Sequence, residues 1–240
     1  MVSKRIIRSQ ESLKGKPDEE DFENPIEELD VSNLDKVLRL KDSMYNFIKP
    51  DGTLLYPKWF LEAHDFCEDY AAVKQEDKTW NYLTCGGHFL SSISFSKAED
   101  FEDGVARVQA RDEKYNFIKK DGNFLRDDWY ISALPFIYGF ALVESEVDHY
   151  NYLTKQGDYL SDTWFQRAHP FNQRGFALVY NQQYEANIIK TDGTLVSQTW
   201  YRYMNELGIC YATIYRYHPD NRWIKLYNLV KMDGNLLSDT

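Results

Sequence analysis

The chain has 240 residues, 43% of them hydrophobic and 16% aromatic, which is enough apolar material for a sizeable core. No run approaches the ~20 apolar residues of a membrane-spanning helix, and residues 1–8 lack the apolar centre of a signal peptide. The net charge of −10 argues against a nucleic-acid-binding protein, which would show a basic face. The odd number of cysteines, without pair spacing, indicates reduced thiols in an intracellular type of chain.

Residues 1–44 are expected to form a polar leader. The segment is basic at first and then strongly acidic, and it holds too few apolar residues to offset the entropy of ordering it. We therefore predict that it is mostly disordered. Ser32 and Asp35 resemble a capping box and predict a short helix near residues 33–40. This helix would cap the first repeat; the alternative is that the leader docks onto a partner.

Residues 45–240 contain six copies of one unit, the last copy incomplete. An asparagine and a glycine mark each copy and recur at steps of 35, 35, 35, 36 and 41 residues. The asparagines are Asn46, Asn81, Asn116, Asn151, Asn187 and Asn228, and the glycines are Gly52, Gly87, Gly122, Gly157, Gly193 and Gly234. We interpret both as backbone requirements, because Gly and Asn tolerate a left-handed φ better than other residues do.

Each copy is predicted as a strand, a tight turn, a second short strand, an aromatic connection and a third strand that forms a hairpin with the next copy. In the third copy these elements are residues 115–119, Asp121-Gly122, the region of Leu125, Trp129-Tyr130 and residues 140–143.

The loops between the third strand and the next copy vary most. They are residues 74–78, 111–114, 144–149, 181–185 and 215–223, the last with a turn at residues 218–221. Variable loops that repeat on one side of an array are typical of an exposed, partner-facing edge.

A unit of this size cannot bury its own aromatic face, so neighbouring copies must stack. We therefore predict an all-β fold of tandem β-hairpin repeats stacked as an elongated or superhelical array. A β-propeller is the alternative, although three strands a unit rather than four argue against a standard propeller. The spacing from glycine to tryptophan places the next tryptophan just beyond Thr240, so we expect that the natural chain continues or that this is a fragment.

Residues 101–108 and 136–143 share the closing pattern Phe-x-x-Gly-φ-Ala-x-Val, where φ is apolar. With the turn glycine and the downstream aromatic, residues 45–240 resemble the WG-repeat family of bacterial proteins. The name-giving Trp-Gly is Trp80-Asn81 once and Tyr-Asn in four other copies, which marks a divergent branch. The resemblance implies the repeat type and a bacterial cytoplasmic or virion-associated setting, and it brings no common catalytic residue.

No catalytic, cofactor or metal site is predicted. His64 and His169 occupy the same position of different copies, which lie too far apart to share a metal ion. Cys67, Cys85 and Cys210 share no repeat position with a histidine, so a thiol nucleophile is not indicated. We expect a protein that is not an enzyme.

Tryptophan recurs before a second aromatic residue at Trp59, Trp129, Trp164 and Trp200. The alanine and phenylalanine spaced behind these pairs favour a packing role, and stacking on sugar rings is the alternative. The sequence thus favours a non-enzymatic scaffold that binds another macromolecule, a protein above all, through the repeat loops. A carbohydrate- or cell-surface-binding module, and an accessory region of a longer enzyme or virion protein, are the alternatives. No nucleic-acid partner is expected.

Overall fold

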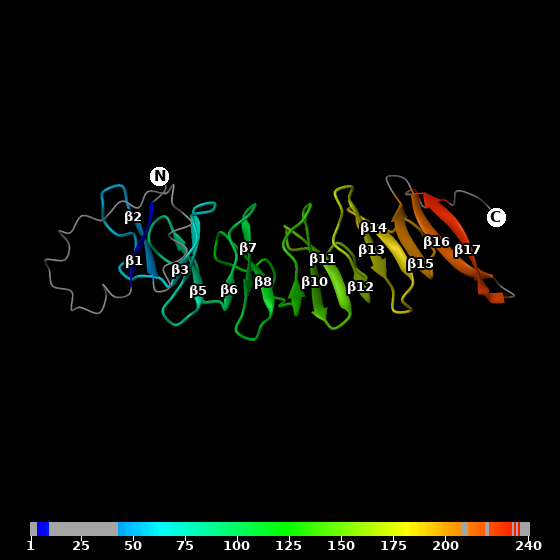
Figure 1. Cartoon of the computed structure of the whole chain (residues 1–240), viewed down its shortest axis with the longest axis horizontal. Helices are drawn as coiled ribbons and strands as arrows, with labels where there is room; N and C mark the ends of the chain where they lie inside the picture. Colours follow the sequence, from blue (N-terminus) through cyan, green and yellow to red (C-terminus); the bar gives the residue numbers. More distant parts are fainter. Residues whose placement is uncertain are drawn as a thin grey trace. The chain divides into compact units, whose positions relative to one another are not determined.

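The structure is a computed structural model that describes residues 4–9, 43–207, 211–218 and 221–231, together with Asp233 and Asn235. Within these ranges every regular element is a β-strand, which confirms the predicted all-β fold (Figure 1). The helix predicted near residues 33–40 lies outside the described residues. No described helix is long and apolar enough to cross a membrane.

The strands are short, and most have five or six residues. In chain order they are β1 (Lys4–Ser9), β2 (Ser43–Ile48), β3 (Glu62–Ala63), β4 (Tyr70–Lys74), β5 (Trp80–Thr84), β6 (Lys97–Ala98), β7 (Val105–Gln109), β8 (Tyr115–Lys119), β9 (Ser132–Ala133), β10 (Phe140–Glu146), β11 (His149–Thr154), β12 (Arg167–Ala168), β13 (Phe176–Tyr180), β14 (Ala186–Lys190), β15 (Tyr203–Leu207), β16 (Tyr211–His218) and β17 (Asn221–Lys231).

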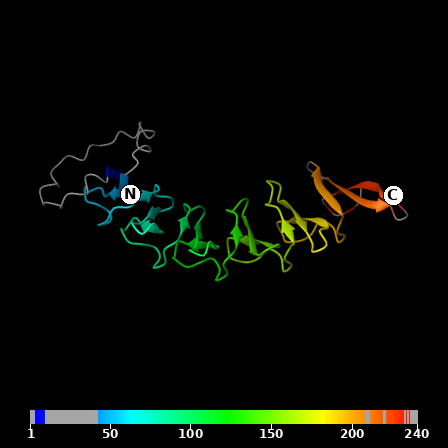
Figure 2. The same ribbon diagram turned by 60° about the horizontal axis from the view of Figure 1, so that its bottom comes forward.

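These strands form one two-stranded sheet and five three-stranded sheets. The orders are β1-β2, β3-β4-β5, β6-β7-β8, β9-β10-β11, β12-β13-β14 and β15-β16-β17. The chain divides into two compact units: the first comprises residues 1–113 and 117–124, and the second comprises residues 114–116 and 125–240. Within the second unit, the sheets around β10 and β13 lie side by side (Figure 1 and Figure 2).

Each three-stranded sheet joins two copies, as the hairpin prediction requires. In the sheet of β3, β4 and β5, the central strand β4 ends the first copy, and β5 begins the second, with Ala71 opposite Leu83. The edge strand β3 lies in the predicted aromatic connection and pairs its buried Ala63 with Val73. A small side chain lets this connection approach the central strand. The predicted second strand is reduced to a single bridge, Leu83 with Phe89.

Two parts of the fold differ from the prediction. Residues 4–9 of the leader form β1, which pairs antiparallel with β2 from Lys4 opposite Ile48 to Ser9 opposite Ser43. The first copy has no preceding third strand, so β1 covers an edge that would otherwise be open. The predicted loops at residues 144–149 and 215–223 are wrong over most of their length. Strands β10 and β11 extend to Glu146 and His149, and β16 and β17 extend to His218 and Asn221.

The aromatic residue after the tryptophan position is buried in the core of the first four copies. Phe60, Phe95, Tyr130 and Phe165 are at most 2% exposed. The tryptophans before Phe60, Tyr130 and Phe165 are only partly buried. In the second copy, Ser94 takes the place of the tryptophan. In the first, third and fourth copies the packing role is therefore borne by the second residue of the pair, whereas Trp200 and Tyr201 are both partly buried.

The recurring asparagine acts through its side chain, so the prediction of a left-handed φ is wrong for it. Asn46 Nδ2 donates to the carbonyl oxygens of Tyr56 and Lys58 at 2.8 and 2.9 Å, and its Oδ1 accepts the Phe47 N–H at 2.8 Å. Asn116 repeats this arrangement on Arg126 and Asp128 at 2.9 and 3.0 Å. Among the described residues with positive φ, none is a recurring asparagine. We call this arrangement the asparagine clamp; it fixes the aromatic connection to the first strand.

The turn glycine does take the predicted left-handed conformation. Gly87 has φ of +78°, and a Cβ atom there would lie 2.4 Å from the carbonyl oxygen of Leu55 in the preceding copy. In the second unit, Gly157 has φ of +90° and would bring a Cβ to 2.7 Å from the Leu125 carbonyl. Successive copies therefore stack in each unit through a contact that only glycine allows.

Candidate functional site

A pocket of about 190 Å³ opens in the second unit beside two partly buried tryptophans. Trp164 and Trp200 occupy the same position of consecutive copies, and the loop of residues 181–185 connects β13 to β14 next to them. The residues that line the pocket are Thr163, Trp164, Phe165, Asn181, Gln182, Gln183 and Trp200. Two aromatic faces thus meet three side-chain amides and a hydroxyl.

The loop of residues 181–185 is held in shape by its first residue. Asn181 Oδ1 accepts the backbone N–H groups of Gln183 and Glu185 at 3.0 and 2.9 Å, and the Asn181 carbonyl accepts the Tyr184 N–H at 2.9 Å. Gln182 and Gln183 are exposed at the tip of this turn. Their side-chain amides have no hydrogen-bond partner in the described part of the chain, so they are available to a ligand.

Trp164 is fixed by two aromatic neighbours. The His149 ring stacks on it with 4.4 Å between the ring centroids and 9° between the ring planes. Tyr159 meets it edge-on at 4.8 Å. These contacts limit the rotamers of the indole before any ligand arrives.

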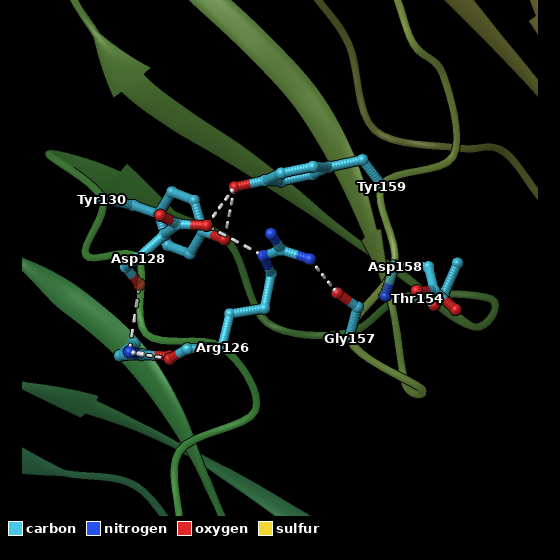
Figure 3. Close-up of polar contacts among 8 residues, drawn as sticks. Arg126, Asp128, Tyr130, Thr154, Gly157, Asp158 and Tyr159 are labelled. Carbon is cyan, nitrogen blue, oxygen red and sulfur yellow. Dashed lines mark hydrogen bonds and ion pairs between the residues drawn. The ribbon is translucent and has the colours of Figure 1, made fainter.

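Tyr159 is in turn held by a polar network between two copies (Figure 3). Its hydroxyl lies 3.0 Å from that of Tyr130 and donates to Asp128 Oδ2 at 3.1 Å. The Arg126 guanidinium lies over the Tyr159 ring at 4.4 Å, donates to Asp128 Oδ2 at 2.9 Å and to the Gly157 carbonyl at 2.7 Å. The network connects the copy that carries Trp129 to the copy that carries Trp164.

The charges of this network follow from its contacts. The hydrogen bond from Arg126 lowers the pKa of Asp128 below its usual value. Burial raises the pKa of Tyr130 and of Tyr159, so both phenols are neutral near neutral pH. Arg126 and Asp128 therefore form an ion pair beside two neutral hydroxyls, which supports the position of Tyr159.

The equivalent place in the first unit has different chemistry. Ser94 stands where Trp164 and Trp200 stand in their copies, and Gln75 Nε2 donates to its hydroxyl at 3.1 Å. The adjoining loop carries Glu76, Asp77 and Lys78. The aromatic pair beside a loop that begins with three amide side chains, Asn181 to Gln183, is thus not a general feature of the repeat.

The residues weighed from sequence do not converge on a reactive site. His64 lies in the first unit with its Nδ1 2.7 Å from Asp100, and His169 lies in the second unit. In the described ranges, no group of three or more His, Cys, Asp or Glu residues could hold a metal ion. Burial raises the pKa of the Cys67 and Cys85 thiols, which disfavours the reactive thiolate. Cys210 lies outside the described residues.

No family model matches the chain, and no curated protein matches its sequence. Solved structures give weak similarities. The computationally designed Ika8 protein is 13% identical over 71% of this chain and 61% of its own, with a TM-score of 0.35. Hsv2p of Kluyveromyces lactis is 10% identical over 79% and 68%, with a TM-score of 0.35. The WD40 β-propeller domain of Doa1 is 12% identical over 71% and 68%, with a TM-score of 0.28.

This chain spans less than two thirds of the designed protein that it matches. At these identities and TM-scores, the similarities assign neither a family nor an activity to it. The argument for function therefore depends on the repeat loops and on the pocket.

Proposed function

We propose that this protein is a non-enzymatic binding module of the WG-repeat type that engages another macromolecule, a protein above all, through its hairpin-tip loops. These loops are residues 75–79, 110–114, 147–148 and 181–185. One observation carries the proposal: the loops repeat one backbone feature but differ in side chains. Lys78, Glu113, Asp148 and Tyr184 all have positive φ, between 57° and 68°.

The side chains that these turns display are suited to different contacts. The first loop is charged, whereas the third presents Val147 with 79% of its surface exposed and the fourth presents Tyr184 with 60% exposed. We infer that Val147 and Tyr184 are the anchors of the binding surface, because aromatic and apolar side chains carry much of the binding energy at protein interfaces. Because the turns are already ordered, binding loses little further conformational entropy.

Site-specific photo-cross-linking tests the proposal. A photoreactive amino acid would replace Val147 or Tyr184 in the full chain, and Asp192 in the control. Tyr184 and Asp192 lie at opposite ends of β14, and Asp192 is also exposed. We expect one protein to cross-link in host lysate from Val147 and Tyr184, and the purified partner to bind the wild-type chain.

The purified partner should bind the Tyr184→Ala variant about tenfold more weakly, since that change removes one anchor worth about 1.4 kcal/mol. Equal cross-linking from Asp192, or no protein adduct from either tip, would contradict the proposal.

A further inference from the structure

We propose that the pocket between Trp164 and Trp200 binds a neutral sugar residue of a glycan. This goes beyond the proposed function, because a sugar site requires no protein partner. Four features of the pocket carry the inference: its size, its lack of charge, its pairing of aromatic faces with unoccupied polar groups, and the fixed position of Trp164.

The size of the pocket limits the ligand to a small group. Its volume of about 190 Å³ is below the ~300–1,000 Å³ of pockets for drug-sized molecules. A single sugar ring at the end or side of a glycan fits this scale, whereas a nucleotide or an extended cofactor does not.

The lining indicates a neutral ligand. None of the seven lining residues has an ionisable side chain, although 28% of the chain is charged. The nearest carboxylate in sequence, that of Glu185, already accepts a hydrogen bond from Asn181 Nδ2 at 3.2 Å and faces Arg202 Nε at 3.9 Å. A phosphate or carboxylate ligand would find no compensating cation in this lining.

The polar groups distinguish a sugar from other neutral ligands. The amides of Gln182 and Gln183 can donate and accept, as sugar hydroxyls do, and the Thr163 hydroxyl adds a third such group. In the described part of the chain, none of these three side chains has a hydrogen-bond partner. The indole of Trp200, and the part of the Trp164 indole that His149 and Tyr159 leave uncovered in the pocket lining, offer apolar surface for the C–H groups of a ring.

A proline-rich peptide also docks on aromatic grooves. Its backbone offers carbonyl acceptors, but a proline-rich peptide has few N–H or O–H donors to satisfy the acceptor oxygens of this polar rim. The chemistry of the pocket therefore favours a sugar ring over a proline side chain.

The surroundings of Trp164 prepare the pocket for such a ligand. His149 stacks on the indole, and Tyr159 is held against it by Arg126, Asp128 and Tyr130. A side chain that is already fixed loses little rotamer entropy when a ring stacks on it.

The test uses the purified full chain and an array of neutral, anionic and amino-sugar glycans, with no other protein present. Calorimetry then measures the affinity of the best neutral glycan for the wild type and for two variants. Trp200→Ala removes one aromatic face. The double variant Gln182→Ala/Gln183→Ala removes only exposed amides, so it keeps the test valid if Trp200→Ala fails to fold. Glu76→Ala, in the equivalent loop of the first unit, is the matched control.

We expect a neutral glycan to bind, each pocket variant to bind it about tenfold more weakly, and Glu76→Ala to bind as the wild type does. The inference is overturned if no neutral glycan binds, if the double variant binds normally, or if a proline-rich peptide displaces the glycan. Because no protein partner takes part, this outcome is independent of the cross-linking result.

Discussion

Equivalent side-chain positions between successive copies are apolar in the first unit and polar in the second. In the first unit, Tyr56, Phe60 and Phe89 form an aromatic cluster with ring centroids 5.0 to 6.3 Å apart. At the corresponding positions of the second unit stand Arg126, Tyr130 and Tyr159, joined by hydrogen bonds and by a guanidinium over a ring. The repeated backbone thus accepts an apolar or a polar filling, provided that each added polar atom has a partner.

The largest expected loss of stability comes from removing an aromatic ring from the cluster of the first unit. Phe60→Ala should lower the free energy of unfolding by about 3–5 kcal/mol, because it leaves a cavity among tightly packed rings. Chemical denaturation with hydrogen exchange of the first two copies measures this. Tyr56→Ala, at a partly exposed position, serves as the milder control, and a loss for Phe60→Ala no larger than that of the control would show that the cluster does not carry the core.

The asparagine clamp should contribute equally to the stability of the first and the second unit. Asn46→Ala in the first unit and Asn116→Ala in the second should each cost about 2–3 kcal/mol, because each leaves two carbonyls without their amide donor. The same denaturation assay applies, with the exposed Asn123→Ala as a control expected to stay within about 0.5 kcal/mol of the wild type. Clearly unequal losses of unfolding free energy in the two units would mean that the contribution of the clamp depends on whether apolar or polar side chains pack beside it.

The stabilising contribution of the polar network around Arg126 should depend on salt, unlike that of the aromatic cluster. Arg126→Ala should cost about 1–2 kcal/mol at low salt, since it removes an ion pair, a contact with a ring and a hydrogen bond to a carbonyl. Raising the ionic strength should shrink this loss, because Asp128 is exposed and its attraction to Arg126 is screened. The loss from Tyr56→Ala should stay constant over the same salt range; parallel salt responses of the two variants would refute the distinction.

The smallest expected effect is the pH dependence of the stability that Asp128 contributes. Because the pKa of Asp128 is lower in the folded than in the unfolded chain, its stabilising contribution is present above the unfolded value of ~3.9 and is lost as pH falls through the folded value. Asp128→Asn removes this contribution, so the stabilities of variant and wild type should differ at pH ~7 and begin to converge only as pH falls below ~4. Stability measured against pH checks this, with the exposed Asp162→Asn as a control that should show no such convergence.

The local features of the fold could be predicted from sequence. The first strands and the Asp-Gly turns depend on neighbouring residues only, and Gly87 and Gly157 take the left-handed conformation expected of them. The hairpin between copies also follows from local order, because β4 and β5 are separated by one short loop.

The features that depend on distant partners could not be predicted. The carbonyls bound by Asn46 lie 10 and 12 residues away and belong to the backbone, so no side-chain pattern marks them. Strand β1 forms where the first copy lacks a preceding strand, an absence that no motif within residues 4–9 reveals. The pocket combines two copies and a loop. The matching positions of Trp164 and Trp200, beside the amide side chains of residues 181–183, were the one available signal.

The contact between the turn glycine and the preceding leucine carbonyl bears on how such a chain can evolve. A duplicated copy carries a glycine for the copy before it and a leucine for the copy after it, as Gly157 and Leu125 show. This contact therefore survives the gain or loss of whole copies, whereas a partial duplication would separate its two halves. At Gly52, where no atom lies within 4 Å of a hypothetical Cβ, only the φ of +83° still requires glycine. The first copy is thus released from one of the two constraints that its successors carry.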